Sequence, residues 1–225
     1  MKSPVRILRD YLPHRMRSAI AETRGRGLLS GYHSRLGCFF VHIPRTGGTS
    51  VAKALFADRS SHAPWHFYQR QFPLEFAALF KFCVARNPWD RLVSTYFYLK
   101  QGGMDRSDQI WARENIAHFP TFGDFVREWL DEGNIWTWVH FLPQYYFVAD
   151  RSGRLMVDFA ARFEHLAQDF EIICDEIGLR SELPQLNRSE HRTFTQYYDE
   201  ETAEIVRRIY ARDIELFGYR FDKGD

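Results

Sequence analysis

The sequence predicts an α/β domain whose mainly parallel central sheet is flanked by helices. Residues 39–43 and 79–85 are short, nearly continuous apolar runs, as expected of strands buried on both faces. A helical stretch follows each run within a few residues, and consecutive strand–helix units favour a parallel sheet. The chain has 225 residues, 45% of them hydrophobic, which is enough for one core of ordinary domain size.

Residues 1–36 form a basic arm ahead of the domain, which we place at residues 37–225. The arm carries eight Lys or Arg residues against two acidic ones, whereas the whole chain has a net charge of +1. Apolar residues recur in it at roughly helical spacing, interrupted by Pro13 and several glycines. We expect a surface helix packed on the domain or on a second copy in a homodimer. Weak contact with an anionic membrane surface is the alternative.

No window approaches the roughly 20 apolar residues of a transmembrane span, and the first residues lack a signal-peptide core. Cys38, Cys83 and Cys174 are far apart in apolar surroundings, which favours reduced, buried thiols. The sequence therefore predicts a cytoplasmic protein without a transmembrane segment. It shows neither a cluster with metal-ligand spacing nor a basic stripe interleaved with aromatics, so we expect no metal and no nucleic acid.

The first strand–helix unit contains a short glycine loop. Pro44 ends the strand, Gly47 and Gly48 supply permissive backbone, and a helix runs from Ser50 to Phe56.

The second strand–helix unit begins after a loop over 60–68 that is rich in histidine, proline and aromatic residues. Its strand spans 79–85. Asn87 is the expected N-cap and Pro88 the first residue of a helix that ends before Gly102.

Beyond this unit the pattern predicts one irregular stretch, two short strands and three helices. In chain order these are irregular residues 104–120, a helix at 121–130, strands at 144–148 and 155–158, and helices at 165–177 and 199–217. Internal repeats and low-complexity tracts are absent from the sequence.

The loop at 44–50 has the composition of an anion site. Backbone N–H groups of such a loop attract a phosphate together with the N-terminus of the next helix. Arg45 adds a cation, and Thr46, Thr49 and Ser50 add hydroxyl donors. A plain glycine turn is the other interpretation. No lysine follows the glycines, unlike in a Walker A motif, which counts against a nucleotide-hydrolysing enzyme.

A second anion site is expected at the second strand–helix unit. Arg86 stands at the carboxyl end of its strand, where ligands bind in open α/β sheets. Arg91 follows near the first helical turn, and Ser94 lies eight residues after Arg86. Each residue alone has an ordinary structural explanation, but together with the first loop they indicate two phosphate-type subsites on adjacent strand ends.

These residues resemble two motifs of carbohydrate sulfotransferases of the heparan and chondroitin type. Residues 42–50 (HIPRTGGTS) are similar to the 5′-phosphosulfate loop of that family, and residues 86–96 (RNPWDRLVSTY) to its 3′-phosphate motif. Four further segments match in order, namely 140–144 (HFLPQ), 162–166 (RFEHL), 186–189 (LNRS) and 210–219. The resemblance covers roughly residues 37–221 and implies a P-loop NTPase-like fold.

What the resemblance implies is transfer of a sulfuryl group from 3′-phosphoadenosine-5′-phosphosulfate (PAPS) to a hydroxyl, usually on a sugar. The two anionic ends of this co-substrate fit the two anion sites. The residues that would contact it are Pro44, Arg45, Thr46, Gly47, Gly48, Thr49, Ser50, Arg86, Arg91 and Ser94. In such an in-line displacement, positioning and charge stabilisation do most of the work.

Position 45 departs from the family, which most often has lysine there. Arginine keeps the charge and can bridge two oxygens, but it cannot donate a proton at ordinary pH. Arg45 would thus stabilise charge on the leaving phosphate. An inactive relative is the alternative that this replacement leaves open.

A base must take the proton of the acceptor hydroxyl, and histidine suits this task near neutral pH. In the heparan-type relatives a catalytic histidine falls between the two donor motifs, where this chain has His62 and His66. His62 is the first candidate and His66 the second, with a packing role as the alternative for both. We expect a structural hydrogen bond at His140 and burial of His42.

Two other functions stay open. A small-molecule kinase with an atypical phosphate loop would need Mg²⁺ and an acidic ligand at a strand end, for which the sequence offers no convincing candidate. A non-catalytic anion- or glycan-binding relative would explain Arg45. The acceptor itself is undetermined, because acceptor pockets are built from variable loops, here expected at 58–72, 104–120 and 180–197.

Overall fold

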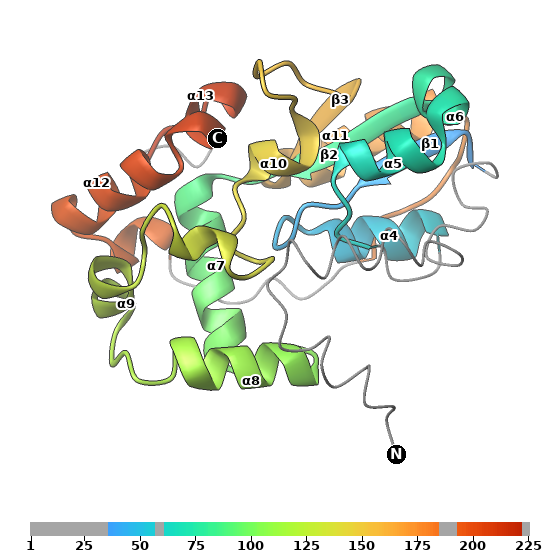
Figure 1. Ribbon diagram of the computed structural model, residues 1–225. Helices are drawn as coiled ribbons and strands as arrows, with labels where there is room; N and C mark the ends of the chain where they lie inside the picture. Colours follow the sequence, from blue (N-terminus) through green and yellow to red (C-terminus); the bar gives the residue numbers. More distant parts are fainter. Residues whose placement is uncertain (1–35, 57–60, 185–192, 222–225) are drawn as a thin grey trace.

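A three-stranded parallel sheet forms the centre of the computed structural model, which describes residues 36–56, 61–184 and 193–221 (Figure 1). The strands are β1 (Cys38–Val41), β2 (Phe80–Ala85) and β3 (Phe159–Arg162), in the order β1-β2-β3. Both pairings are parallel. The predicted fold class, a parallel sheet flanked by helices, is therefore confirmed. The basic arm expected at 1–36 falls, but for its last residue, outside the described part.

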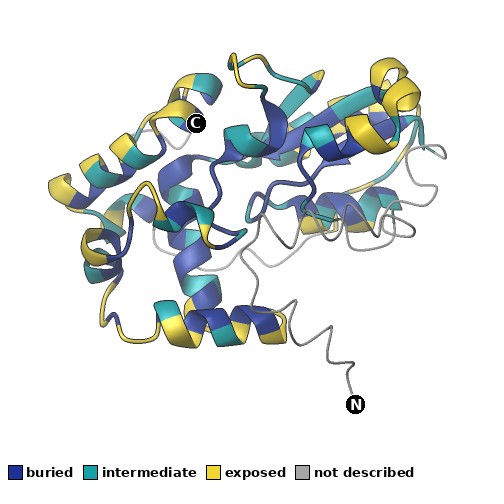
Figure 2. Ribbon diagram, viewed as in Figure 1, coloured by how far each residue is buried: buried dark blue, intermediate teal, exposed yellow. Residues whose placement is uncertain are grey.

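Strand β1 and most of β2 are buried, as the nearly continuous apolar runs predicted, whereas β3 is mostly half-buried (Figure 2). One face of the sheet packs against α4 (Gly48–Phe56) and α11 (Leu166–Glu176). Its inward side chains come from alternate strand positions, namely Cys38, Phe40, Phe82, Val84 and Ala161. Full burial of one such large apolar side chain contributes roughly 1.5–3 kcal/mol.

The other face of the sheet packs against α5 (Trp65–Gln71), α6 (Pro73–Ala78) and α10 (Gln144–Val148). Its inward side chains are the intervening strand residues Phe39, Val41, Cys83 and Ala85. This alternation follows from the two-residue period of a strand. The three cysteines predicted to be reduced and buried are free and buried.

A layer of helices lies beside the sheet (Figure 1). It holds a third hydrophobic cluster, which is rich in aromatic residues. It is built by α7 (Pro88–Lys100), α8 (Arg106–Asn115), α9 (Phe122–Glu128) and α12 (Glu200–Ile209). The ring pairs within it are mostly tilted or edge-on, and the fully enclosed Phe125 contacts the rings of Tyr96, Trp129 and Phe141. Such contacts add to area burial and fix α7 relative to its neighbours.

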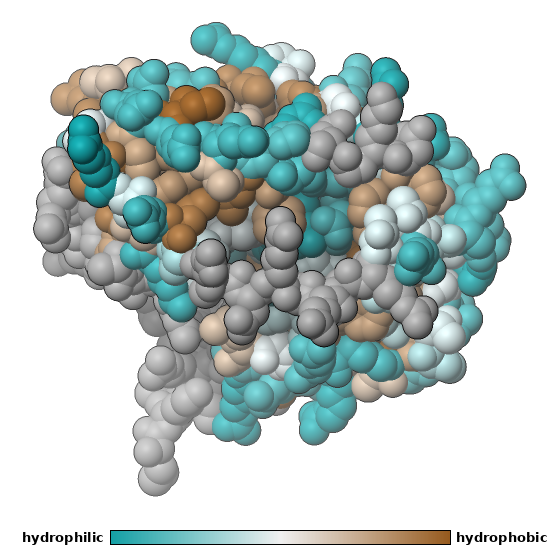
Figure 3. All heavy atoms as spheres, turned by 180° about the vertical axis from the view of Figure 1, so that it is seen from behind, coloured by the Kyte–Doolittle hydropathy of each residue, from teal (hydrophilic) through white to brown (hydrophobic). Residues whose placement is uncertain are grey.

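The remaining elements are short. They are α13 (Ala211–Phe217) and the 3₁₀ turns η1 (Asn134–Trp136), η2 (Phe163–His165) and η3 (Phe194–Tyr197). From the opposite side, hydrophilic side chains cover much of the surface and hydrophobic ones gather toward the upper left (Figure 3). Leu74, Met104 and Ile172 are the large apolar side chains most exposed in the described part.

The helix boundaries follow local capping chemistry where the sequence predicted them. The Asn87 side chain accepts a hydrogen bond from the Trp89 amide at 3.1 Å, with Pro88 as the first residue of α7. Thr121 forms a capping box with Asp124 at the start of α9. Gly178, just after α11, has a φ of 66°, as its predicted role as a stop requires.

The prediction that residues 104–120 are irregular was wrong. Residues Arg106–Asn115 form α8, whose N-cap Asp105 accepts a hydrogen bond from the Asp108 amide at 2.9 Å. Its buried positions include the polar residues Ser107 and Asp108 beside Trp111. An apolar stripe of helical period is therefore missing, which hid the helix.

The two strands predicted at 144–148 and 155–158 were also wrong. Residues Gln144–Val148 form α10, and the third strand lies further on, at Phe159–Arg162. The carboxylate of Asp213 accepts hydrogen bonds from the amides of Gln144 at 2.7 Å and Tyr145 at 2.8 Å. This cap comes from a residue almost 70 positions away, so no local pattern could indicate it.

Two further segments differ from the expected pattern. The last helix is divided into α12 and α13 at Tyr210, whose backbone leaves helical geometry. The Tyr210 hydroxyl donates to the Phe141 carbonyl at 2.8 Å. The expected loop over 60–68 contains the start of α5, which follows Pro64.

Replacing Asp213 with alanine should lower the free energy of unfolding by about 2 kcal/mol, because two buried N–H groups of α10 lose their acceptor. Chemical denaturation at pH 7 measures this change. Glu215→Ala, an exposed carboxylate on the same helix, is the matched control and should change stability by less than about 0.5 kcal/mol. Equal effects of the two substitutions would contradict the capping role.

Candidate functional site

The backbone of the loop between β1 and α4 restricts which residues can stand at positions 45, 47 and 48. Gly47 has a φ of 80°, and Arg45, at 67°, is the only residue other than glycine with positive φ among those described. Left-handed geometry costs an ordinary residue about 1–2 kcal/mol. A Cβ on Gly48 would lie 2.2 Å from the His42 ring. The loop therefore admits only glycine at 48 and holds Arg45 in a strained conformation.

The loop hydroxyls divide into internal and outward groups. Thr46 is fully buried and donates to the Ile43 carbonyl at 2.9 Å, so its hydrogen stays within the loop. Thr49 is exposed and Ser50 half-buried, in the first turn of α4. The Ser50 amide donates to the Gly47 carbonyl at 3.0 Å, which closes the turn.

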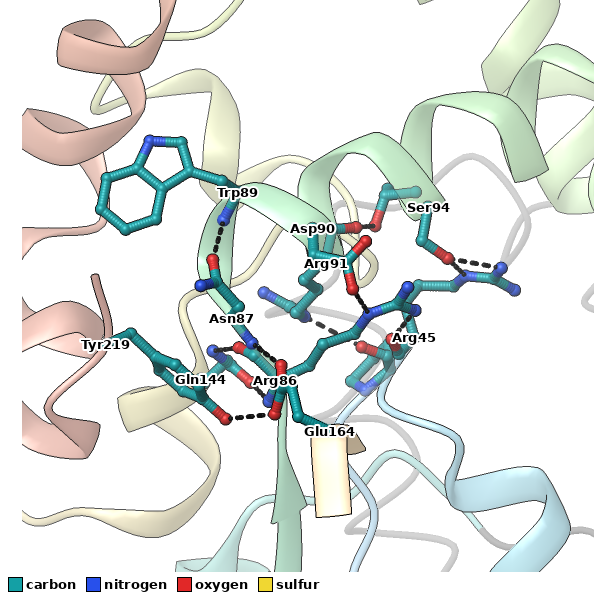
Figure 4. A network of polar contacts seen from close by, with 12 residues as sticks. Arg45, Arg86, Asn87, Trp89, Asp90, Arg91, Ser94, Gln144, Glu164 and Tyr219 are labelled. Atoms are coloured by element: carbon teal, nitrogen blue, oxygen red, sulfur yellow. Dashed lines mark hydrogen bonds and ion pairs between the residues drawn. The ribbon is translucent and has the colours of Figure 1, made fainter. Parts of the chain in front are cut away.

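Arg45 reaches from the loop to α7 (Figure 4). Its Nη2 and Nε atoms lie 2.9 and 3.3 Å from Ser94 Oγ, and its guanidinium lies over the Tyr98 ring, 4.3 Å from the centroid. Ser94 accepts these contacts and keeps its own hydroxyl hydrogen as a donor. The structure thus joins two residues that the sequence placed in separate anion sites.

Arg86 lies at the carboxyl end of β2, where the sequence predicted it. It donates to the Asp90 carboxylate at 2.8 Å and to the Arg45 carbonyl at 3.1 Å, and its guanidinium lies 4.0 Å from the centroid of the Phe163 ring. The Gln144 amide holds both backbone groups of Arg86, at 3.0 and 2.8 Å (Figure 4). Side chain and backbone of Arg86 are therefore both fixed.

Arg91 connects three segments from a buried position. Its Nε donates to the Pro44 carbonyl at 2.9 Å and its Nη2 to the His140 carbonyl at 3.2 Å. These contacts tie the loop to α7 and to the segment before α10. The main role of Arg91 in this structure is therefore to hold the loop in place.

The three guanidinium groups give the site an excess of positive charge. Burial, and then repulsion from Arg86, lowers the pKa of Arg45 to about 10. Burial also lowers the pKa of Arg91, although Tyr210 and Asp213 oppose this. Asp90 is the carboxylate bonded directly to this cluster. Such a site is stabilised by binding an anion.

The two candidate histidines lie in different surroundings. His62 Nδ1 is 3.1 Å from the His42 carbonyl, and its ring centroid lies 4.3 Å from that of His42. A carbonyl can only accept, so Nδ1 carries the hydrogen and Nε2 holds the lone pair in the neutral ring. His66 lies within α5 and packs on Trp65 and Tyr146. His62 is thus the histidine that contacts the backbone next to the loop.

His42 and His140 take the structural positions expected of them. His42 is buried and stacked on Phe40. His140 Nε2 lies 3.2 Å from Asp108 Oδ1, while its Nδ1 is buried and has no hydrogen-bond partner in the described part of the chain.

Two residues of the site, Gln144 and Asp108, had no role assigned from the sequence. Gln144 and Glu164 lie in segments that match family motifs, but their contacts become visible only in the folded structure. Glu164 accepts hydrogen bonds from the Asn87 amide at 2.7 Å and the Tyr219 hydroxyl at 3.1 Å (Figure 4). Asp108 lies in the segment predicted to be irregular, and no local pattern distinguished it.

The described residues contain no group of three or more His, Cys, Asp or Glu side chains placed to hold a metal ion. None of their helices combines the length and apolar character that crossing a bilayer requires.

Comparison with known proteins agrees with this geometry. A family model described as "Sulfotransferase family" matches residues 35–220, which include both the loop and the Arg86 segment. The chain is also 31% identical, over 103 residues, to a protein of Archaeoglobus fulgidus described as "Uncharacterized protein". That alignment covers 45% of this chain and 70% of the relative.

Proposed function

The chain belongs to the sulfotransferase family, and from this membership we propose that it moves a sulfuryl group from PAPS to a hydroxyl of a carbohydrate acceptor. The observation that carries the proposal is the contact of Arg45, in the loop after β1, with Arg86 at the end of the adjacent strand β2 and with Ser94 on α7. One compact, positively charged site thus combines elements of both expected anion subsites.

The residues present suit a ligand with two anionic ends. Gly48 lets the loop pack directly against the His42 ring, and the first turn of α4 presents Thr49 and Ser50. Pro44, Arg45 and the rest of the loop through Ser50 would hold the 5′-phosphosulfate. Arg86 and Ser94 would hold the 3′-phosphate, with Arg91 supporting the loop between them.

PAPS supplies an activated sulfuryl group, whose S–O bond to phosphate breaks as a new S–O bond to the acceptor forms. His62 would accept the proton of the acceptor hydroxyl at Nε2, while its Nδ1–H stays on the His42 carbonyl. Arg45 would stabilise the negative charge that grows on the phosphate. Neither task needs a proton from Arg45, so arginine is compatible with turnover.

The carbohydrate acceptor follows from the motif resemblance, and its identity is part of the proposal. Two of the segments expected to form the acceptor pocket, 58–72 and 104–120, contain the helices α5 and α8 rather than bare loops. A cytoplasmic location and a homodimer likewise stay predictions.

A ligand and turnover comparison tests the function. Adenosine 3′,5′-bisphosphate, the product nucleotide, should raise the melting temperature, whereas ATP with Mg²⁺ should not. Labelled sulfate should pass from PAPS to members of a polysaccharide panel. Nucleotide binding without transfer to any acceptor would instead support a non-catalytic binding protein. Stabilisation by ATP with Mg²⁺ alone would support the kinase alternative.

Arg86→Ala should weaken binding of adenosine 3′,5′-bisphosphate by about 2 kcal/mol, roughly 30-fold, through loss of a charge-assisted contact. Isothermal titration calorimetry measures the change. Arg113→Ala removes an exposed arginine of α8 and should leave the affinity within about twofold. An unchanged affinity of the Arg86 variant would contradict the assignment of the 3′-phosphate subsite.

His62→Ala should lower kcat by about 100-fold or more, the usual size of general-base catalysis, with nucleotide affinity within about twofold. Steady-state kinetics and calorimetry give the two values. His66→Ala, four positions further on, should keep most of the turnover. The reverse order of effects would transfer the role of base to His66.

A further inference from the structure

Asp108 is a buried carboxylate beside the site that the proposed function does not use. It is 5% exposed and accepts hydrogen bonds from three side chains. The donors are Tyr98 Oη at 2.6 Å, Trp138 Nε1 at 3.1 Å and His140 Nε2 at 3.2 Å. A buried charge with this many donors from separate segments is costly to build, so its position calls for an explanation.

The shortest of these contacts leads directly to Arg45. The Tyr98 hydroxyl donates to Asp108 Oδ2 and accepts from the Met104 amide at 3.0 Å, so the ring is held at its outer end. The face of this ring is the surface on which the Arg45 guanidinium lies, 4.3 Å from the centroid. Asp108 thus contacts Arg45 through a single intervening side chain.

Two side chains of α7, Ser94 and Tyr98, form a clamp on the guanidinium of Arg45. Ser94 and Tyr98 are four residues apart on α7 and therefore point the same way. Ser94 Oγ accepts hydrogen bonds from the edge of the guanidinium, and the Tyr98 ring packs against its face. A lysine ammonium is a point charge and lacks the plane and the fork that this pair of contacts uses. The clamp therefore matches the arginine that stands where the family usually has lysine.

The turn between α7 and α8 is built to bring Asp108 to Tyr98. Gly103 has a φ of 64°, and a Cβ on it would lie 2.3 Å from the Asp108 Cβ. Any other residue would both strain the backbone and push α8 away from α7. The close approach of the two helices thus depends on this glycine.

The electrostatics agree with the geometry. Burial opposes ionisation of Asp108, but the hydrogen bond and charge of His140, with the bonds from Tyr98 and Trp138, lower its pKa to about 2. Asp108 and Tyr98 both raise the pKa of Arg45, against burial and repulsion from Arg86 and Arg91. Asp108 is therefore a permanent negative charge that favours Arg45 in its place.

We propose that Asp108 is a positioning residue, which orients the guanidinium of Arg45 for catalysis by fixing the ring of Tyr98. The inference rests on the proposed function for its catalytic consequence, but not for the orientation of Arg45. Asp108 touches neither reacting group and acts through Tyr98.

The test combines kinetics with a direct view of Arg45. Asp108→Asn removes the charge at nearly constant shape, and Tyr98→Phe keeps the ring but not the hydroxyl. Each should lower kcat about tenfold, and the double variant should be no worse than either single one. In an Arg45→Lys background, Asp108→Asn should cost less than about twofold. Asp105→Asn, the exposed helix cap three residues earlier, is the matched control and should change nothing.

The direct readout is the Arg45 Nε–H resonance of arginine-labelled protein, assigned by its loss in Arg45→Lys. It should be shifted by the Tyr98 ring current in the wild type and move toward the value of a free arginine in Asp108→Asn. Equal losses of kcat in the arginine and Arg45→Lys backgrounds, or an unmoved resonance, would overturn the proposal. Should Asp108→Asn fail to fold, the Tyr98→Phe kinetics and resonance decide.

The two hypotheses fail in different ways. A wild-type protein that transfers no sulfate contradicts the proposed function. The Arg45 Nε–H resonance, compared between the wild type and Asp108→Asn, still tests whether Asp108 orients Arg45. A wild type that transfers sulfate, with Asp108→Asn equal to it in kcat and resonance, contradicts the positioning role alone.

Discussion

Unbalanced positive charge at the carboxyl edge of the sheet is the constraint on which the rest of the site depends. Arg45, Arg86 and Arg91 lie together, and two of them donate to backbone carbonyls of the loop that carries the first. Carbonyl dipoles hold guanidinium groups in place without neutralising them. Apart from the Arg86–Asp90 pair, the fold therefore keeps these cations close together while leaving their charge available to an anion.

Holding such a cluster requires rigid surroundings, and long-range contacts supply them. Asp213 caps α10, α10 presents Gln144, and Gln144 binds the backbone of Arg86 on both sides. Burial raises the pKa of Asp213 to about 6, and its hydrogen bonds with the amides of Gln144 and Tyr145 oppose this rise.

The sequence indicated residues of the candidate site wherever their chemistry coincided with a local structural signal. A glycine loop after a buried strand, and an arginine followed by an Asn-Pro helix start, indicated Arg45, Arg86 and Ser94, because these features need only neighbours in the chain. Asp108 was not predicted, since its helix buries polar residues and its partners come from other segments. The same limit applied to α10, whose cap lies on α13.

The sequence by itself determined the fold class, the two strand–helix units and the glycines that the loop requires, because alternation, capping and backbone strain act over a few residues. Only the tertiary structure decided which charges meet. It brought Ser94 to Arg45 and Tyr98 to Asp108, and it placed His62 rather than His66 beside the loop. Contacts between distant segments depend on how helices pack over the sheet, and packing is not encoded in any short stretch of sequence.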